Sequence, residues 1–407
     1  MTTYDVIVAG AGPGGATAAA VAARAGLRVL LVDRARFPRD KVCGDALSGK
    51  TVDVMNRLGI TDAVATASSV DSWGVLFGSP GGSEVVIPFA EPNDEMDPPG
   101  YLCAREIFDE LVVQCAVEEG ADLCEQTVVE GLIRSGERVT GVRLREGTSR
   151  RDEHARVVIG ADGAYSAVAR ALGFVQLDAR HYYAGVRGYY RGVTGFRPGN
   201  VIELHFVEEA IPGYFWIFPM ADGMVNVGMG TLSARIKRKD VRLKEVLRTT
   251  VESPRFRARF ERSERIGPVR GWGMPLGSSP RPMAGAGWML VGDAASLIDP
   301  FTGEGIGNAM LSGEMAGRWA ARAREADDAS AAFLQSYERD VHRALDAELR
   351  LSYTLRRLER WRWLLDTVIR KAERNPEVAW TISSMFNDLG ARERLTSPLF
   401  YLRLLMS

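Results

Sequence analysis

The sequence is poor in residues that bind metals or form disulfides. It has four cysteines and four histidines in 407 residues, and the cysteines form neither a CxxC pair nor another zinc spacing. We therefore expect reduced thiols, no disulfide framework and no metal. The histidines show no metal spacing and no triad partner, so we interpret each as polar surface or satisfied core. These residues are Cys43, Cys103, Cys115, Cys124, His154, His181, His205 and His342.

The sequence also lacks an excess of charge and a long apolar run. Lys and Arg number 51 against 52 Asp and Glu, a net charge of -1, so no overall field attracts a nucleic-acid backbone. We expect no nucleic-acid partner. No apolar run reaches the roughly 18 residues of a membrane-spanning helix, and the first residues, MTTYDVIVAG, show no signal-peptide pattern. These absences predict a cytoplasmic protein.

A dinucleotide-binding pattern opens the chain. A continuous apolar strand is expected over residues 4–9, followed by a glycine turn, an Ala-rich helix and a second apolar strand over residues 28–32 that ends at Asp33. Continuous apolar strands are typical of a parallel sheet that is covered on both faces. The order of strand, glycine turn, helix, strand and acid favours a dinucleotide site over a purely structural turn.

The glycines of that turn each have a physical reason. Gly10, Gly12 and Gly15 form the pattern G-x-G-x-x-G. The first glycine makes the tight turn, the second admits a pyrophosphate close to the backbone, and the third lets the helix pack on the strand. Asp33 is then placed to accept hydrogen bonds from ribose hydroxyls.

Two further acid-glycine turns favour a flavin over a nicotinamide cofactor. The turn-rich residues 71–100 interrupt the regular alternation of strands and helices that a nicotinamide enzyme would show. A second turn lies at Asp162-Gly163, and a third begins at Asp293 and opens a helix. A long cofactor across the sheet explains all three turns, with Asp293 on the ribityl chain and backbone amides at the isoalloxazine edge. The glycines of the third turn are Gly303, Gly305 and Gly307.

The pattern of elements predicts an α/β fold with two domains. We expect an FAD-binding Rossmann-type (GR2-like) domain, an inserted antiparallel β-sheet domain for the substrate, and C-terminal helices. The inserted sheet is indicated by short segments rich in aromatic and β-branched residues. The predicted limits are 1–70, 101–178 and 274–330 for the FAD-binding domain, 71–100 and 179–273 for the sheet domain, and 331–407 for the helices.

The sequence resembles the FAD-dependent oxidoreductases of the aromatic-hydroxylase fold, and among them the geranylgeranyl reductase family. The motifs that carry the resemblance are GAGPGG, PRDKVCGDALS, AREIFDEL, GADGAYSAVAR, YFWIFPMADGMVNVGMG and GDAASLIDPFTGEGIGNAM. The Cys-Gly loop and the Tyr-x-Trp-x-Phe-Pro segment with its following Gly-x-Gly are the motifs that discriminate within the superfamily. The resemblance covers the chain to about residue 330 and implies saturation of isoprenoid double bonds.

The resemblance also implies a set of cofactor-binding residues. In this set the first turn binds ADP, Arg105 reaches the phosphates, the strand near Val128 meets the adenine, and the loop at Cys43 lies against the flavin ring. Gly44 then permits close approach, so that the thiol faces the reacting ring. The cofactor-binding residues are Gly10, Gly12, Gly14, Gly15, Asp33, Arg34, Cys43, Gly44, Ala46, Arg105, Val128, Asp162, Asp293, Pro300, Gly303, Gly305, Ile306 and Gly307.

Cys43 and one aromatic strand are the candidates for the chemistry itself. Cys43 is the catalytic candidate, although a thiol that merely lines the pocket fits equally, whereas the other cysteines read as inert small hydrophobes. Alternate residues of the aromatic strand share one face, which either packs on the core or lines an apolar slot for an isoprenoid. We favour the slot. The substrate-binding residues are Tyr214, Trp216, Phe218, Pro219, Gly228 and Gly230.

The predicted activity is an FAD-dependent reduction of carbon-carbon double bonds in an isoprenoid or prenyl lipid. Hydride comes from reduced flavin, and NADPH, ferredoxin or another donor supplies the electrons. Two alternatives stay open: a flavin-dependent monooxygenase or halogenase on the same fold, and a non-catalytic prenyl-binding protein. Halogenases carry Gly-Trp-x-Trp-x-Ile-Pro where residues 213–219 read GYFWIFP, and Tyr214 and Phe218 depart from that motif.

A peripheral contact with the inner face of the membrane is the last expectation. Aromatic and aliphatic residues alternate with arginines near the C-terminus, which suits an interfacial helix that collects a water-insoluble lipid. Packing of the same stripe on the FAD domain, or a dimer contact, is the structural alternative. The residues are Trp361, Trp363, Leu364, Leu365, Phe400, Tyr401, Leu404 and Leu405.

Overall fold

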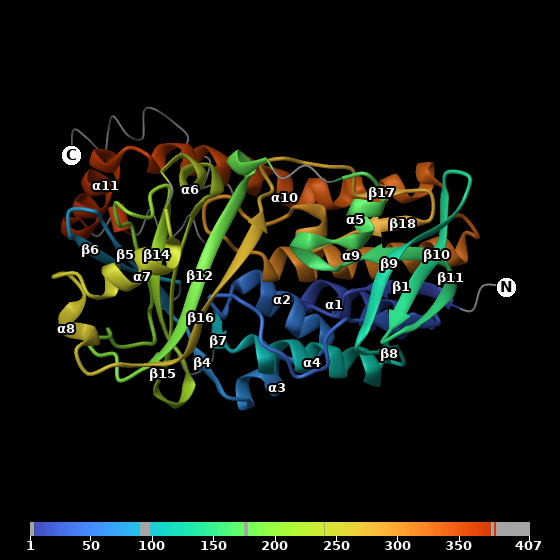
Figure 1. The fold of residues 1–407 in the computed structure, drawn as a ribbon, viewed down its shortest axis with the longest axis horizontal. Coiled ribbons are helices and arrows are strands. Elements are labelled where there is room, and N and C mark those ends of the chain that lie inside the picture. Colours follow the sequence, from blue (N-terminus) through green and yellow to red (C-terminus); the bar gives the residue numbers. More distant parts are fainter. Residues whose placement is uncertain (1–3, 90–97, 175–177, 240, 376–377, 380–407) are drawn as a thin grey trace.

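The computed structural model describes most of the chain, which forms two lobes, each built on a large β-sheet. The described residues are 4–89, 98–174, 178–239, 241–375 and 378–379. One lobe is built on an eight-stranded sheet and the other on a seven-stranded sheet, and a long helix, α10, runs along both (Figure 1). Phe400, Tyr401, Leu404 and Leu405 lie outside the described residues.

The eight-stranded sheet has a parallel centre made of apolar strands. Its order is β17-β18-β11-β1-β2-β8, where β18, β11, β1, β2 and β8 run parallel and β17 is antiparallel. Strands β9 and β10 extend the long β11 as an antiparallel meander. The strands are β1 (Tyr4–Ala9), β2 (Val29–Val32), β8 (Asp122–Cys124), β9 (Thr127–Ser135), β10 (Arg138–Glu146), β11 (Ser149–Gly160), β17 (Ala284–Gly285) and β18 (Trp288–Leu290).

The helices of this lobe pack closely because small residues meet where they cross. A Cβ on Gly313 of α9 would lie 2.1 Å from the carbonyl oxygen of Gly14 in α1, and a Cβ on Gly317 would lie 2.7 Å from that of Ala18. Glycine is therefore required at the crossing. The longer helices are α1 (Pro13–Arg24), α2 (Gly49–Leu58), α4 (Arg105–Glu118), α9 (Ile306–Glu325), α10 (Ala331–Glu359) and α11 (Arg362–Arg374).

The seven-stranded sheet forms the wall of the second lobe. Its order is β16-β12-β15-β14-β13-β5-β6, and all neighbouring strands are antiparallel except β13 and β5, which are parallel. Segments 74–88 and 182–275, far apart in the sequence, thus share one sheet. The strands are β5 (Gly74–Gly78), β6 (Glu84–Pro88), β12 (Tyr182–Arg191), β13 (Ile202–His205), β14 (Gly213–Pro219), β15 (Met224–Leu232) and β16 (Glu264–Pro275).

Shorter elements connect the two lobes and cover the sheets. A three-stranded sheet of order β3-β7-β4 joins them, and α7 packs on β12 and β15. The remaining elements are β3 (Ala46–Leu47), β4 (Ser69–Asp71), β7 (Tyr101–Cys103), α3 (Thr61–Thr66), α5 (Ala167–Ala171), α6 (Ser233–Lys239), α7 (Leu243–Val251), α8 (Arg257–Phe260) and the 3-10 turns η1 (Gly163–Tyr165), η2 (Ala179–His181), η3 (Ala221–Gly223) and η4 (Gly292–Ala295).

The fold class expected from the sequence is confirmed, with two refinements. One strand pair of the inserted sheet is parallel, and the C-terminal stripe is split at Arg360 and Trp361 into the end of α10 and the start of α11. The domain limits stay a prediction. Within the part of the chain that the structure describes, no helix is long and apolar enough to cross a bilayer.

Candidate active site

A cavity of about 1390 Å³ lies between the two large sheets. It exceeds the roughly 300 to 1,000 Å³ that is usual for a small-molecule site, so it has room for a dinucleotide and a second ligand. The carboxyl ends of β1, β2 and β11 and the start of α9 meet β12, β14, β15 and β16 there. Of the predicted residues, those that line it are Gly10, Gly12, Gly14, Asp33, Arg34, Cys43, Gly44, Arg105, Val128, Asp162, Asp293, Gly303, Gly305, Ile306, Tyr214, Trp216, Phe218 and Gly230.

Six predicted residues do not line the cavity but support its walls. A Cβ on Gly15 would lie 1.8 Å from the Gly10 carbonyl oxygen, and one on Gly228 would lie 2.3 Å from the Trp216 ring. The backbone N–H of Gly307, the second residue of α9, donates to the Glu304 carboxylate at 3.2 Å. The others are Ala46 in β3, Pro300 in the turn before α9, and Pro219 at the end of β14.

The first glycine turn forms a close cradle at the end of β1. Gly10 has φ +99°, and a Cβ there would lie 2.5 Å from the Ala161 carbonyl oxygen, so only glycine fits. Asp33 ends β2, and its two carboxylate oxygens accept the backbone N–H groups of Ala11 and Ala35, each at 2.8 Å. These bonds fix the carboxylate while leaving lone pairs for ribose hydroxyls.

Two arginines share one buried acid beside this cradle. Arg105 donates to both carboxylate oxygens of Asp109 at 2.6 and 2.8 Å, and Arg39 Nη1 lies 2.7 Å from the same carboxylate. Burial would lower the pKa of Arg105, but Asp109 outweighs it and raises that pKa. Two positive charges balanced by one carboxylate leave a net positive region, which suits a pyrophosphate. Sequence reasoning gave Arg39 no cofactor role.

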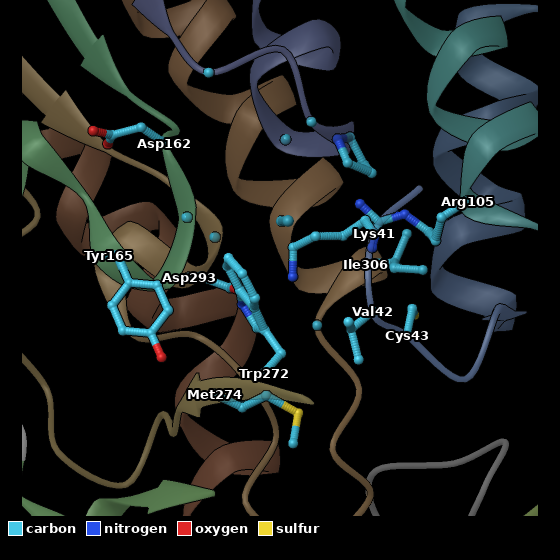
Figure 2. A pocket seen from close by; sticks show the side chains of 18 of the residues that line it. Lys41, Val42, Cys43, Arg105, Asp162, Tyr165, Trp272, Met274, Asp293 and Ile306 are labelled. Carbon is cyan, nitrogen blue, oxygen red and sulfur yellow. The ribbon is translucent and has the colours of Figure 1, made fainter. Parts of the chain in front are cut away.

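Lys41 is the functional candidate that the sequence did not single out. Its ammonium lies 4.0 Å from the centre of the Trp272 ring, and Figure 2 shows it reaching toward Asp293 and Trp272. Burial lowers the pKa of Lys41 to about 8, while Asp293 opposes this shift. Burial raises the pKa of Asp293, and its carboxylate accepts no hydrogen bond from the described residues. Both groups are therefore available to a ligand.

The Cys43-Gly44 loop is held against the seven-stranded sheet. The Asn226 side chain donates to the Cys43 carbonyl oxygen at 2.8 Å and to Asp45 at 2.7 Å, and it accepts the Trp216 indole N–H at 2.8 Å. A Cβ on Gly44 would lie 2.8 Å from the Phe218 ring. Glycine in this loop thus lets an aromatic wall come close to the thiol.

A buried acid anchors the far end of the same loop. Asp45 has φ +65° and is fully buried, and burial raises its pKa to about 6 while Arg187, Tyr189 and Asn226 oppose the shift. Tyr189 donates to Asp45 at 2.6 Å, and Arg187 donates to Asp40 at 2.5 Å. The loop position is therefore set by side chains from β12 and β15.

The aromatic face of β14 serves both as core and as cavity wall. Trp216 and Phe218 are buried in a cluster with Leu102, and their edges line the cavity. Tyr214 donates its hydroxyl to the Thr302 carbonyl oxygen, which ties β14 to the turn before α9. A Cβ on Gly303 would lie 3.1 Å from that hydroxyl, and its φ of +71° also favours glycine.

The second acid-glycine turn mostly serves its own helix. Asp162 accepts the N–H groups of Ala167 and Val168 at 2.6 and 3.2 Å and caps α5 together with Ser166. Figure 2 shows its carboxylate turned away from Lys41. The backbone of this turn still lines the cavity.

The other cysteines and the histidines lie away from the cavity lining. Burial raises the pKa of the Cys103 thiol to about 12 and also raises that of Cys115, as expected for inert buried thiols. Among the described residues, no group of His, Cys, Asp and Glu has the arrangement of a metal site. His205 is fully buried and bonded to Glu203 at 2.9 Å, so it is a satisfied core residue.

These features fit FAD. The glycine cradle and Asp33 suit the adenosine half, the arginines suit the pyrophosphate, and Asp293 and the glycines before α9 suit the ribityl chain and the ring. A Cβ at Gly12 would meet only Arg39 Nη2, at 3.7 Å, and would occupy part of the cavity, whereas Cβ atoms at Gly10 and Gly14 would lie 2.5 and 2.8 Å from the Ala161 and Ala309 carbonyl oxygens. The fold and the cavity together define an FAD-dependent oxidoreductase.

Comparisons with known proteins agree with this class. A family model described as an FAD binding domain matches residues 3–352. A menaquinone reductase of Mycobacterium tuberculosis is 35% identical over 77% of this chain and 75% of its own. A digeranylgeranylglycerophospholipid reductase of Thermoplasma acidophilum is 31% identical over 83% of each chain. The crystal structure of a geranylgeranyl bacteriochlorophyll reductase-like protein from Thermoplasma acidophilum gives a TM-score of 0.82 at 28% identity, covering 92% of each chain.

The chain belongs to the geranylgeranyl reductase family of FAD-dependent oxidoreductases, and FAD is its cofactor. A flavin-dependent brominase also matches, with a TM-score of 0.75, 21% identity and coverage of 94% of this chain and 97% of its own. Likeness at that identity shows the fold alone. The sequence resemblance is thus confirmed at the level of the family.

Proposed function

We propose that the protein reduces carbon-carbon double bonds in the isoprenoid chain of a lipid. Its relatives are named for menaquinone and for digeranylgeranylglycerophospholipid, and both molecules carry isoprenoid chains. The observation that carries the proposal is the wall formed by Trp216 and Phe218 against the Cys43-Gly44 loop. An apolar wall at that place suits an isoprenoid better than a polar aromatic substrate.

The chain's own residues bind, orient and exclude water. When bound, reduced FAD supplies the hydride. We propose that Asp33, Arg105 and Asp293 hold the cofactor, and that Tyr214, Trp216 and Phe218 hold the isoprenoid chain. We also propose that Cys43 lies against the reacting double bond and fixes its position, since its loop is clamped by Asn226. Orientation of this kind and a dry cavity are the protein's main contributions.

Two features favour reduction over halogenation. Tyr214 and Phe218 stand where the halogenase motif has Trp and Ile. In this structure the Tyr214 hydroxyl bonds the Thr302 carbonyl oxygen and the Phe218 ring packs at Gly44. Both differences therefore take part in building the cavity. A non-catalytic prenyl-binding protein would have no use for the intact cofactor cradle.

Product analysis tests the proposal. The purified protein is reduced with dithionite under anaerobic conditions and incubated with menaquinone or with digeranylgeranylglycerophospholipid in detergent micelles. We expect mass spectrometry to find a product with two more hydrogen atoms for each bond reduced. A parallel incubation in air with bromide and phenol detects monooxygenase or halogenase activity. Hydroxylated or brominated phenol, with both lipids unchanged, would contradict the proposal.

We further propose that the protein meets its lipid substrate at a membrane surface. Trp361 and Trp363 are 46% and 56% exposed at the junction of α10 and α11, and Arg360 lies over the Trp361 ring at 5.3 Å. Core packing would have buried these indoles. Exposed tryptophans beside arginines suit the interface of an anionic bilayer.

We also propose that NADPH, ferredoxin or another donor supplies the electrons for the reduction.

A further inference from the structure

The helices behind the seven-stranded sheet carry an excess of positive charge. Residues 235–270 contain 13 Lys and Arg against 5 Asp and Glu, a net charge of +8, whereas the whole chain has -1. Helices α6, α7 and α8 pack apolar residues such as Ile236, Leu247 and Phe260 in one cluster with Phe215 of β14. These helices therefore cover the same face of the sheet, and their charged side chains lie on its outer side.

Six exposed cations on this outer side form no ion pair with any residue that the structure describes. Arg242 and Arg248 of α7 are instead paired with acids of their own helix. Glu261 and Glu264 are exposed acids of the same segment, so positive charge stays in excess when both are counted. We call the six unpaired cations the basic face: Lys237, Arg238, Lys244, Arg257, Arg262 and Arg265.

The basic face reaches the mouth of the cavity at one edge of the sheet. Strand β16 is the edge strand, and its residues 268–272 line the cavity together with Lys244 of α7. The Arg270 side chain is 54% exposed there, and its carboxylate partner, Asp40 at 3.1 Å, is shared with a second arginine. A partner that binds the basic face therefore lies at the opening of the cavity that fits FAD.

The composition of this surface indicates the kind of partner. Among its described residues, Ile266 is the large apolar side chain that is exposed, at 37%. The surface thus lacks the apolar side with which an interfacial helix enters a bilayer. It suits a short-lived complex with a protein of opposite charge, in which long-range attraction speeds encounter and little area is buried. Electron-transfer partners typically meet through small interfaces.

We propose that the basic face docks a small acidic electron-carrier protein, which reduces the bound FAD through the mouth of the cavity. This inference rests on the proposed function, because each double bond reduced consumes two electrons that an outside donor replaces. Two carrier molecules lose one electron each, and FAD gains both electrons together with two protons from water. NADPH would use only the few cations at the mouth, whereas the basic face extends over three helices and the start of β16.

Charge reversal tests the docking without a change in the cavity lining. The basic-face variant combines Arg262→Glu with Arg265→Glu, two exposed residues that do not line the cavity. The hairpin variant combines Arg134→Glu with Arg138→Glu and is the matched control, because it makes the same change in net charge at exposed positions of β9 and β10. Figure 1 shows α8 at one end of the molecule and β10 toward the other.

The reaction is followed in a stopped-flow instrument without oxygen and without lipid. Each protein carrying oxidised FAD is mixed with a photochemically reduced two-iron ferredoxin, which is an acidic one-electron carrier, or with NADPH. We expect the ferredoxin to reduce FAD in the wild type at low salt, at a rate that falls steeply as salt is added. The rate in the basic-face variant should be at least about tenfold lower.

The hairpin variant should match the wild type, and FAD content and melting temperature should be equal in all three proteins. Wild-type protein that NADPH reduces and the ferredoxin does not would overturn the proposal. Equal ferredoxin rates in the two variants would overturn it as well.

Direct binding gives a second readout that involves no electron transfer. Calorimetric titration with the oxidised ferredoxin at low salt should give a Kd at least about tenfold higher in the basic-face variant than in the wild type. Loss of binding to anionic vesicles in this variant, with an unchanged Kd for the ferredoxin, would assign the face to a membrane and overturn the proposal. Chemically reduced wild-type protein that leaves both lipids unchanged would contradict the proposed function separately, since neither ferredoxin measurement includes a lipid.

Discussion

At the scale of single residues, burial shifts the pKa of a charged group in the site, so that its charge changes with pH near neutrality. Lys41 shows this most clearly, because its ammonium lies in the cavity against Trp272 and beside Asp293. An ordinary lysine keeps its charge to a pH near 10.4, whereas burial brings the pKa of Lys41 to about 8. Lys41 therefore loses its positive charge within the pH range in which enzymes are usually assayed.

This shift predicts that FAD binding weakens as the pH rises. The bound cofactor is negatively charged, so it should raise the pKa of Lys41 above its value in the cofactor-free protein, and binding then takes up a proton once the pH exceeds about 8. The Kd for FAD should then increase by up to about tenfold per pH unit above that point. Flavin fluorescence titrations at pH 7 and pH 9 measure it. In Lys41→Met the Kd for FAD should be higher than in the wild type at pH 7 and nearly independent of pH. A pH dependence equal to that of the wild type would show that Lys41 is not the group that titrates.

Cys43 lies in the cavity lining, and its side chain is close to Arg105. Cys43→Ser is nearly isosteric, so melting temperature and FAD content should stay at wild-type values. If the thiol positions the double bond, turnover should fall by up to about 100-fold and partly reduced products should accumulate. Mass spectrometry of the lipid products measures this. A wild-type product distribution would show that Cys43 only fills space.

At the scale of elements, strand β15 fixes the loop that carries Cys43. The Asn226 side chain joins β14, β15 and the loop through three hydrogen bonds. These bonds hold the glycine-containing loop against the sheet. This arrangement explains how a short loop can present a thiol reproducibly.

Removing the Asn226 side chain should therefore affect both stability and the cofactor. Asn226→Ala leaves the Trp216 indole and the Cys43 carbonyl without this partner and leaves Asp45 with only its bond from Tyr189, so it should cost about 2 to 4 kcal/mol of unfolding free energy. Thr231→Val on the same strand removes a single bond to the Pro212 carbonyl oxygen and serves as the control. Denaturant titration and FAD retention measure the two effects. Equal losses in both variants would mean that the loop has no special dependence on Asn226.

Helix α11 is the element that we expect to meet the membrane. Wild-type protein should co-sediment with vesicles that contain anionic lipid at low salt and be released at high salt, because the arginines are screened. Trp361→Ala combined with Trp363→Ala should stay in the supernatant with its FAD bound. Trp319→Ala is unsuitable as a control because that indole bonds Asp340, so Val117→Ala, an exposed apolar residue near the end of α4, is preferred. Wild-type protein that ignores the vesicles at low salt would contradict the expectation.

At the scale of the whole molecule, local patterns predicted more than long-range contacts. Strand β1 begins and ends where the sequence predicts it, because a continuous apolar run is a local signal. The parallel pairing of β13 with β5 joins residues 127 positions apart, such as Ile202 and Val75, and no local pattern encodes it.

The same division holds for the site. The glycine turns were predictable because φ and close approach dictate the residue type. Lys41 was not predictable as a cofactor contact, because a lysine in a basic loop becomes unusual only when other elements bury it.

The central claim is that electrons pass from the flavin to an isoprenoid double bond, and one anaerobic experiment tests it most directly. Protein carrying FAD is reduced with one equivalent of dithionite, freed of oxygen, and mixed in a stopped-flow instrument with menaquinone or digeranylgeranylglycerophospholipid. We predict that the absorbance of oxidised flavin returns in one phase and that one double bond is saturated per flavin, by mass spectrometry of the quenched mixture. Flavin that stays reduced with both lipids, and is reoxidised only when oxygen is admitted, would contradict the account.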